Sequence, residues 1–177
     1  VNRWIVAEYN EAIAKTTAAI EAYRFNEAAD ALYSFVWHSY CDWYVELVKP
    51  QRDGDATETR ATAAAILAGS LRLLHPIMPY LTEELNQKIF HSDDMLIAAN
   101  WPQASPVKGR NAVSDIQFLI SLITEIRYIR SEMNVPLSAK PVLQVRGMSA
   151  AQAAVLDSQS AALMRLARVS GVMVVDQ

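Results

Sequence analysis

Apolar residues recur every three or four positions along most of the first 133 residues, which is the pattern of amphipathic α-helices. The first stripe consists of Ile5, Tyr9, Ile13, Thr16 and Ile20. A break follows at Arg24 and Phe25, and Asn26 is the predicted N-cap of the next helix. The second helix is predicted to end near Lys49, because a residue that precedes a proline such as Pro50 avoids helical backbone angles.

Three more long helices are expected after a polar turn at residues 51–56. The third covers about 57–74 and ends before the His75-Pro76 pair, and the fourth begins at Pro79, which suits a first helical turn. The apolar positions of the fourth helix are Leu81, Leu85 and Ile89. The fifth helix covers about 113–133. Its predicted buried stripe is Ile116, Leu119, Ile123, Ile126 and Ile129.

The pattern changes after the fifth helix. Residues 141–146 and 172–175 have the composition of β-strands, and a capping box at Ser149 opens the first of two short helices between them. We therefore predict a mainly α fold. Residues 1–136 form a five-helix bundle, and residues 137–177 form a small α/β appendage with two short strands and two short helices.

An aromatic stretch, WHSYCDWYVE at residues 37–46, holds the most conspicuous polar groups of the second helix. His38, Cys41 and Asp42 are metal-ligand types on one helical face. No second cysteine or paired histidine motif completes a ligand set, so no metal site is predicted. We instead predict that Asp42 is a buried, hydrogen-bonded anchor and that Trp43 packs inside the bundle.

Motifs of catalysis and of nucleotide binding do not occur in the sequence. The pair Glu83-Glu84 is explained by its place near the start of the fourth helix, where negative charge is favourable. Asp53-Gly54-Asp55 lacks the remaining spacing of a calcium loop and is interpreted as a turn. We therefore expect no enzymatic activity and no cofactor in this chain alone.

Composition narrows the class of protein further. No apolar run approaches the roughly 18–20 residues that cross a bilayer, so no membrane partner is expected. One cysteine among 177 residues cannot form an internal disulfide, which fits the cytoplasm. The net charge of −3 gives no sign of a DNA-binding protein, although a local basic patch can still bind nucleic acid.

One such patch is a pair of arginines in the fifth helix. Arg127 and Arg130 lie one turn apart and off the isoleucine stripe, so they project together from one face. Such pairs are mostly solvated surface charges. They are also typical of a helix that contacts RNA phosphates, and both interpretations stay open at this point.

Several longer segments resemble a known family. They are NRWI at the start, RFNEAADALYSFVWHSYCDWYVELVKP at 24–50, LLHPIMPYLTEEL at 73–85, an isolated WP at 101–102 and IRYIRSEMNVP at 126–136. In this order they are similar to the anticodon-binding domain of valine–tRNA ligases, and the CDWYVE core followed by KP points to the valine branch. The resemblance covers essentially the whole chain.

The resemblance implies a tRNA partner and a bacterial parent enzyme that joins valine to its tRNA with ATP and magnesium. The chain departs from the family at Val6-Ala7-Glu8-Tyr9, where a basic residue is common, and at Asn86, where an aromatic is common. The family's catalytic motifs, editing domain and coiled-coil arm have no counterpart here. We therefore expect a monomeric RNA-binding part of a longer protein. The alternatives are a helical interaction module without RNA binding and the equivalent domain of an isoleucine or leucine enzyme.

Within this interpretation, Arg24 and Phe25 are predicted to read the anticodon, because side chains can leave the bundle at a helix break. Phe25 would stack on an unpaired base, and Arg24 would hydrogen-bond a base edge or a phosphate. The competing interpretation makes Phe25 a hydrophobic staple that precedes the Asn26 cap.

Overall fold

The computed structural model describes residues 1–49, 56–107 and 111–175 of the chain. The helices of the bundle are α1 (Asn2–Glu21), α2 (Phe25–Tyr33), η1 (Ser34–Tyr44), α3 (Val45–Val48), α4 (Thr57–Leu74), α5 (Pro79–Phe90) and α6 (Asn111–Glu132). The shorter elements are η3 (Leu96–Ala98), β1 (Val142–Arg146), α7 (Ala150–Ser158), α8 (Ser160–Ala167) and β2 (Gly171–Val175). The turn predicted at 51–56, including Asp53-Gly54-Asp55, lies almost wholly outside the described residues.

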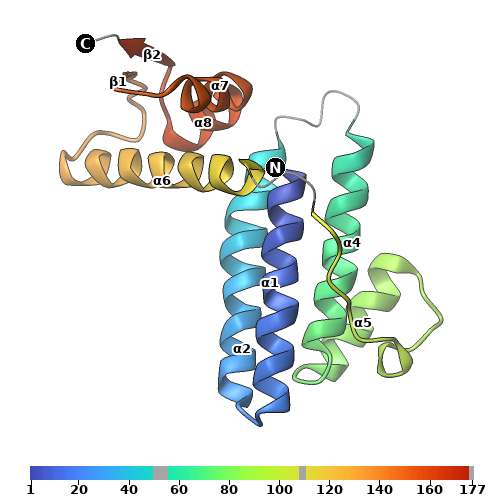
Figure 1. The fold of residues 1–177 in the computed structure, drawn as a ribbon. Coiled ribbons are helices and arrows are strands. Elements are labelled where there is room, and N and C mark those ends of the chain that lie inside the picture. Colours follow the sequence, from blue (N-terminus) through green and yellow to red (C-terminus); the bar gives the residue numbers. More distant parts are fainter. Residues whose placement is uncertain (50–55, 108–110, 176–177) are drawn as a thin grey trace.

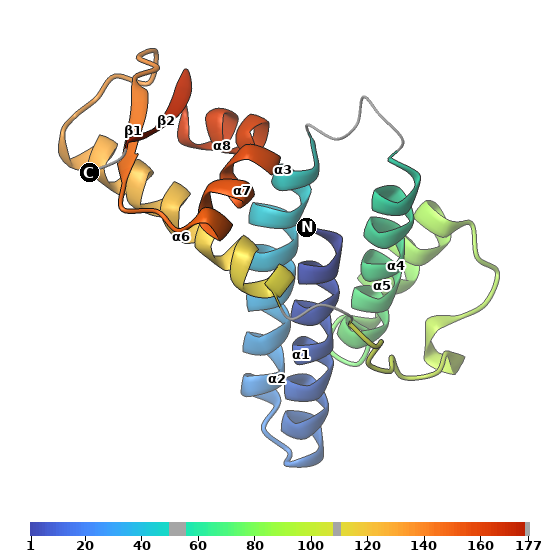
Figure 2. The same ribbon diagram turned by 45° about the horizontal axis from the view of Figure 1, so that its top comes forward.

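The long helices form an elongated bundle with one helix laid across it. Helix α1 runs antiparallel to the continuous rod of α2, η1 and α3, and α4 lies beside this pair (Figure 1). Helix α5 packs mainly on α4. Helix α6 crosses the bundle near the N-terminal end of α1, at a steep angle in both views (Figures 1 and 2). The predicted mainly α fold is confirmed, with the second predicted helix divided into α2, η1 and α3.

One continuous hydrophobic core joins the bundle to the appendage. Helix α6 contributes Ile116, Leu119, Ile123 and Ile126, and the appendage contributes Leu156, Leu163, Leu166 and Val169. Ile129, predicted as a fifth member of the α6 stripe, is instead 56% exposed. On α5, Leu81 and Ile89 also stay exposed. No helix in the described parts of the chain is both long and apolar enough to cross a membrane.

The appendage is a small βααβ unit packed on α6. Its strands are parallel, and Val142 pairs with Gly171 at one end and Arg146 with Val175 at the other. Parallel strands need a crossover connection, which α7 and α8 provide. The predicted capping box is present, because Ser149 Oγ accepts from the backbone N–H of Gln152, 3.2 Å away.

The second rod changes its helical repeat halfway along. Residues Ser34–Tyr44 form a π-helix, whose i→i+5 hydrogen bonds widen each turn by about one residue. Phe35 and Tyr44 are about two and a half turns apart in an α-helix of 3.6 residues per turn, but about two turns apart in the wider helix. Both side chains therefore point into the core and are 4% and 0% exposed.

The wider repeat turns Asp42 outward. Its side chain is 50% exposed, and its carboxylate lies 3.4 Å from His38 Nδ1 on the helix surface. The prediction that Asp42 is a buried anchor is therefore wrong. It was wrong because a carboxylate within an apolar stretch was taken to be buried, whereas Asp42 lies on an exposed face of the π-helix.

Tyr44 is the buried polar anchor of this stretch. Its hydroxyl donates to Asn2 Oδ1 at 3.0 Å and lies 3.3 Å from the carbonyl oxygen of Thr59. Asn2 Nδ2 in turn donates to Glu58 and to the Thr59 side chain, at 3.2 Å each. This network ties together η1, α1 and α4. It links the NRWI and CDWYVE segments, which lie far apart in the sequence.

Candidate nucleic-acid interface

The turn between α1 and α2 presents three exposed side chains, Tyr23, Arg24 and Phe25, which we name the α1–α2 tip. Tyr23 has φ 58°, and the backbone N–H groups of Tyr23 and Arg24 donate to the carbonyls of Ile20 and Ala19. This is the Schellman arrangement that usually holds glycine at the left-handed position. A bulky residue with positive φ costs about 1–2 kcal/mol, so Tyr23 occupies a strained position.

The aromatic rings of the α1–α2 tip are open to solvent. Tyr23 is 81% exposed and Phe25 60%, and their centroids lie 6.3 Å apart with the rings edge to face. Helix α2 begins at Phe25 rather than after Asn26, so the predicted Asn26 cap is wrong. Phe25 is then the first helical residue and is too exposed for a hydrophobic staple. Sequence reasoning missed Tyr23, although an aromatic at a helix end where glycine is usual was a visible signal.

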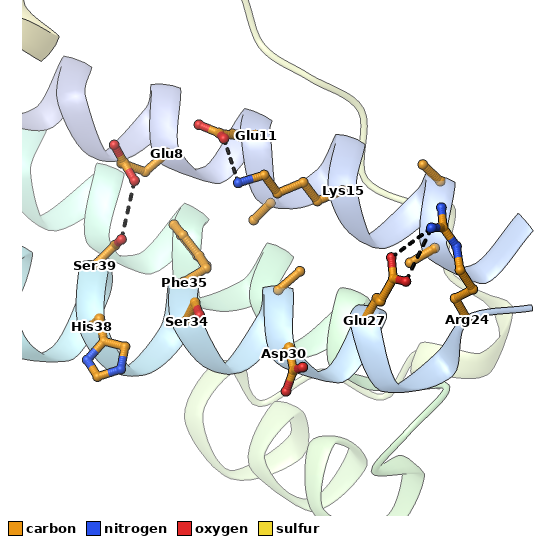
Figure 3. A pocket seen from close by; sticks show the side chains of 14 residues that line it. Glu8, Glu11, Lys15, Arg24, Glu27, Asp30, Ser34, Phe35, His38 and Ser39 are labelled. Carbon is orange, nitrogen blue, oxygen red and sulfur yellow. Dashed lines mark hydrogen bonds and ion pairs between the residues drawn. The ribbon is translucent and has the colours of Figure 1, made fainter. Parts of the chain in front are cut away.

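Arg24 lies at one end of a groove of about 670 Å³ between α1 and the α2–η1 rod (Figure 3). Its guanidinium is 3.1 Å from Glu27, and both side chains are exposed. The groove is lined by four carboxylates, those of Glu8, Glu11, Glu27 and Asp30. Its basic groups are Lys15 and Arg24. The excess of negative charge disfavours an RNA backbone along this groove and leaves Arg24 at its edge.

Arg127 and Arg130 face the appendage. Arg127 Nε donates to the carbonyl of Leu166 at 3.0 Å, and its guanidinium carbon lies 5.4 Å from the ring centroid of Trp43. Arg130 donates to the carbonyls of Arg168, Pro136 and Ala139 at 2.9–3.2 Å. These bonds tie α6 to the appendage, and Trp43 packs half-buried beside Arg127. The two arginines therefore have a structural use, and the phosphate contacts stay a prediction.

Metal ligands do not gather in the described residues: no group of three or more His, Cys, Asp or Glu side chains is close enough to hold an ion. Cys41 is exposed in part, and partial desolvation, followed by the charge of the nearby Asp42, raises the pKa of its thiol. The polar groups of the aromatic stretch therefore form no reactive cluster. The remaining candidate functional groups are aromatic and arginine side chains on the surface, and such groups contact nucleic acid in other proteins.

Residues 2–146 match the family of the anticodon-binding domain of tRNA ligase. The chain belongs to this family. It is 44% identical to the valine–tRNA ligase of Caulobacter vibrioides over 99% of its own length, and 43% identical to that of Rhizobium meliloti over 97%. These alignments cover 20% and 19% of the two relatives, so the chain spans about a fifth of their length. The matched region passes the predicted boundary at residue 136 and includes β1.

The candidate contacts of this anticodon-binding domain lie at opposite ends of the bundle. The α1–α2 tip is at one end, and α6 with the appendage is at the other (Figure 1). Helix α1 has 20 residues and so spans about 30 Å. A single nucleotide cannot touch both ends. An RNA that contacted both would have to lie along the bundle.

Proposed function

We propose that this domain recognises the anticodon arm of a valine tRNA as part of a bacterial valine–tRNA ligase. The proposal rests on the identity to valine–tRNA ligases, which extends over nearly the whole chain. The parent would join valine to its tRNA with ATP and magnesium in other domains. This domain would supply RNA binding, as a monomer in the cytoplasm.

The exposed side chains of the α1–α2 tip support this proposal. Proteins read single-stranded RNA loops by stacking splayed bases on aromatic rings and by hydrogen-bonding base edges. Tyr23 and Phe25 offer two open ring faces, and Arg24 offers donors beside them. The exposed pair with Glu27 is weak enough for Arg24 to exchange it for a base or a phosphate.

Binding of RNA hairpins to the 177-residue chain tests the proposal. Fluorescence anisotropy would compare a valine anticodon stem-loop with the same stem carrying a scrambled loop. We expect the valine loop to bind more tightly, because stacking and edge contacts add to the backbone contacts shared by both hairpins. Equal affinity for the two loops, or no binding of either, would contradict the proposal. It would favour instead a helical interaction module, for which the acidic groove is a suitable surface.

Tyr23→Gly is predicted to stabilise the domain and to weaken RNA binding. Glycine removes the strain of the left-handed position, so the free energy of unfolding should rise by about 1 kcal/mol in urea denaturation. Loss of the ring should lower the affinity for the valine stem-loop, because one stacking surface disappears. A variant that is stabilised but keeps wild-type affinity would remove Tyr23 from the interface.

A further inference from the structure

The cleft between the end of α6 and the appendage is a pocket of about 600 Å³ with a strongly basic lining. Arg127, Arg130 and Arg168 line it together with Ser131 and Asn134, and we name it the arginine pocket. No aspartate or glutamate is among the described residues that line it. These three arginines concentrate positive charge in a chain whose net charge is −3. Such a lining favours a negatively charged ligand.

Two helix ends shape the pocket. Asn134 and Arg168 both have left-handed backbone angles, with φ 50° and 54°, and they end α6 and α8. The last carbonyls of α8 point at α6. Arg127 donates a hydrogen bond to the carbonyl of Leu166, and Arg130 donates one to that of Arg168. The C-terminal end of a helix carries about half a negative charge, so the two ends together carry about one. Three guanidinium charges exceed this, so the pocket remains positive.

The arginines keep free hydrogen-bond donors. A guanidinium has five N–H groups. In the described part of the chain, Arg127 and Arg168 each use one of them, and Arg130 uses three. Arg127 and Arg168 are also exposed to solvent. Their remaining N–H groups are thus held beside the pocket by the backbone bonds and are available to a ligand.

We propose that the arginine pocket binds a backbone phosphate of RNA, and that the appendage is therefore part of the RNA-binding surface. The appendage contributes Arg168 to this phosphate site, and α6 contributes Arg127 and Arg130. The planar guanidinium matches phosphate oxygens with paired hydrogen bonds. The proposal rests on the proposed function for the choice of RNA. An acidic peptide is the competing ligand of like charge, and the test includes it.

Arg168→Gln is the variant that tests the pocket most directly. It removes the charge but keeps an unbranched polar side chain that can still donate hydrogen bonds. Replacing Arg127 or Arg130 would also remove hydrogen bonds that hold the appendage against α6, so those changes do not separate binding from folding. Arg146→Gln is the matched control, because Arg146 is an exposed arginine of the same appendage and does not line the pocket.

The first measurement is the salt dependence of stem-loop binding. We expect Arg168→Gln to weaken valine and scrambled loops equally and to reduce the slope of log K against log salt by about 0.7–0.9. Arg146→Gln should match the wild type. Poly-glutamate should compete poorly with RNA. One outcome is that Arg168→Gln keeps the affinity and salt slope of Arg146→Gln while the wild type still prefers the valine loop. That result would refute RNA binding by the pocket and leave the proposed function standing. Competition by poly-glutamate as strong as that by RNA would also overturn the pocket's assignment to RNA.

The second measurement does not depend on RNA. Inorganic phosphate would be titrated into the labelled protein while the arginine Nε–H resonances are followed by NMR. We expect saturable shifts at Arg127, Arg130 and Arg168, but not at Arg146. If these shifts occurred in a protein that bound no RNA hairpin, the pocket would be an anion site, and the proposed function would be refuted. No shifts at the three arginines would refute the pocket whether or not RNA binds.

Discussion

Tyr44→Ala is expected to be the most destabilising single change in the aromatic stretch. The side chain is 0% exposed, and truncation of a large buried aromatic typically costs about 3–5 kcal/mol. The change also leaves Asn2 Oδ1 without its 3.0 Å donor. A tyrosine hydroxyl is protonated and able to donate at neutral pH, and burial raises the pKa of Tyr44 further, to about 12. Urea denaturation at pH 7 would measure the loss.

Two further variants separate the causes. Tyr44→Phe keeps the ring and removes the hydroxyl, so it should cost about 1–3 kcal/mol, the range for leaving a buried partner unsatisfied. Asp42→Ala should change the free energy of unfolding by less than about 0.5 kcal/mol, because it alters an exposed position with one surface ion pair. A loss in Asp42→Ala as large as that in Tyr44→Phe would contradict the assignment of the anchor to Tyr44.

The helices were predictable because their signals are local. The apolar stripes, the prolines at 76 and 79 and the capping box at Ser149 each act within a turn or two, and the structure places helices where these signals predict them. The π-helix was not predictable in this way. No local sequence signal marks it, and the structure places Phe35 and Tyr44 together in the core through the wider repeat. The same repeat leaves Asp42 on the exposed side.

The candidate interface was predictable only in part. The helix break predicted that the side chains of Arg24 and Phe25 leave the bundle, and both are exposed at the α1–α2 tip. The spacing of Arg127 and Arg130 predicted a shared face but not what it faces. The partners of that face are carbonyls of Leu166 and Arg168, about 40 residues further along the chain. Contacts over such a separation are set by tertiary packing, which a helical repeat does not encode.

Phe25→Leu is expected to have the largest effect on RNA binding. Base stacking on an aromatic ring contributes roughly 1–3 kcal/mol, so affinity for the valine stem-loop should fall by about 5- to 150-fold. Tyr33→Leu is the matched control. Tyr33 is also exposed on α2, but it lies about 12 Å further along the helix and stacks on Trp37. The control should therefore bind RNA as the wild type does.

Arg24→Ala is expected to act on discrimination more than on affinity. Stacking tolerates any base, whereas hydrogen bonds to a base edge do not, so the preference for the valine loop over other anticodon loops should shrink most in this variant. Lys15→Ala is its control, because Lys15 lines the same groove and pairs with Glu11 as Arg24 pairs with Glu27. Folding of each variant would be checked by thermal melting. If well-folded Arg24→Ala and Phe25→Leu proteins keep wild-type affinity and preference, the anticodon is read by other residues.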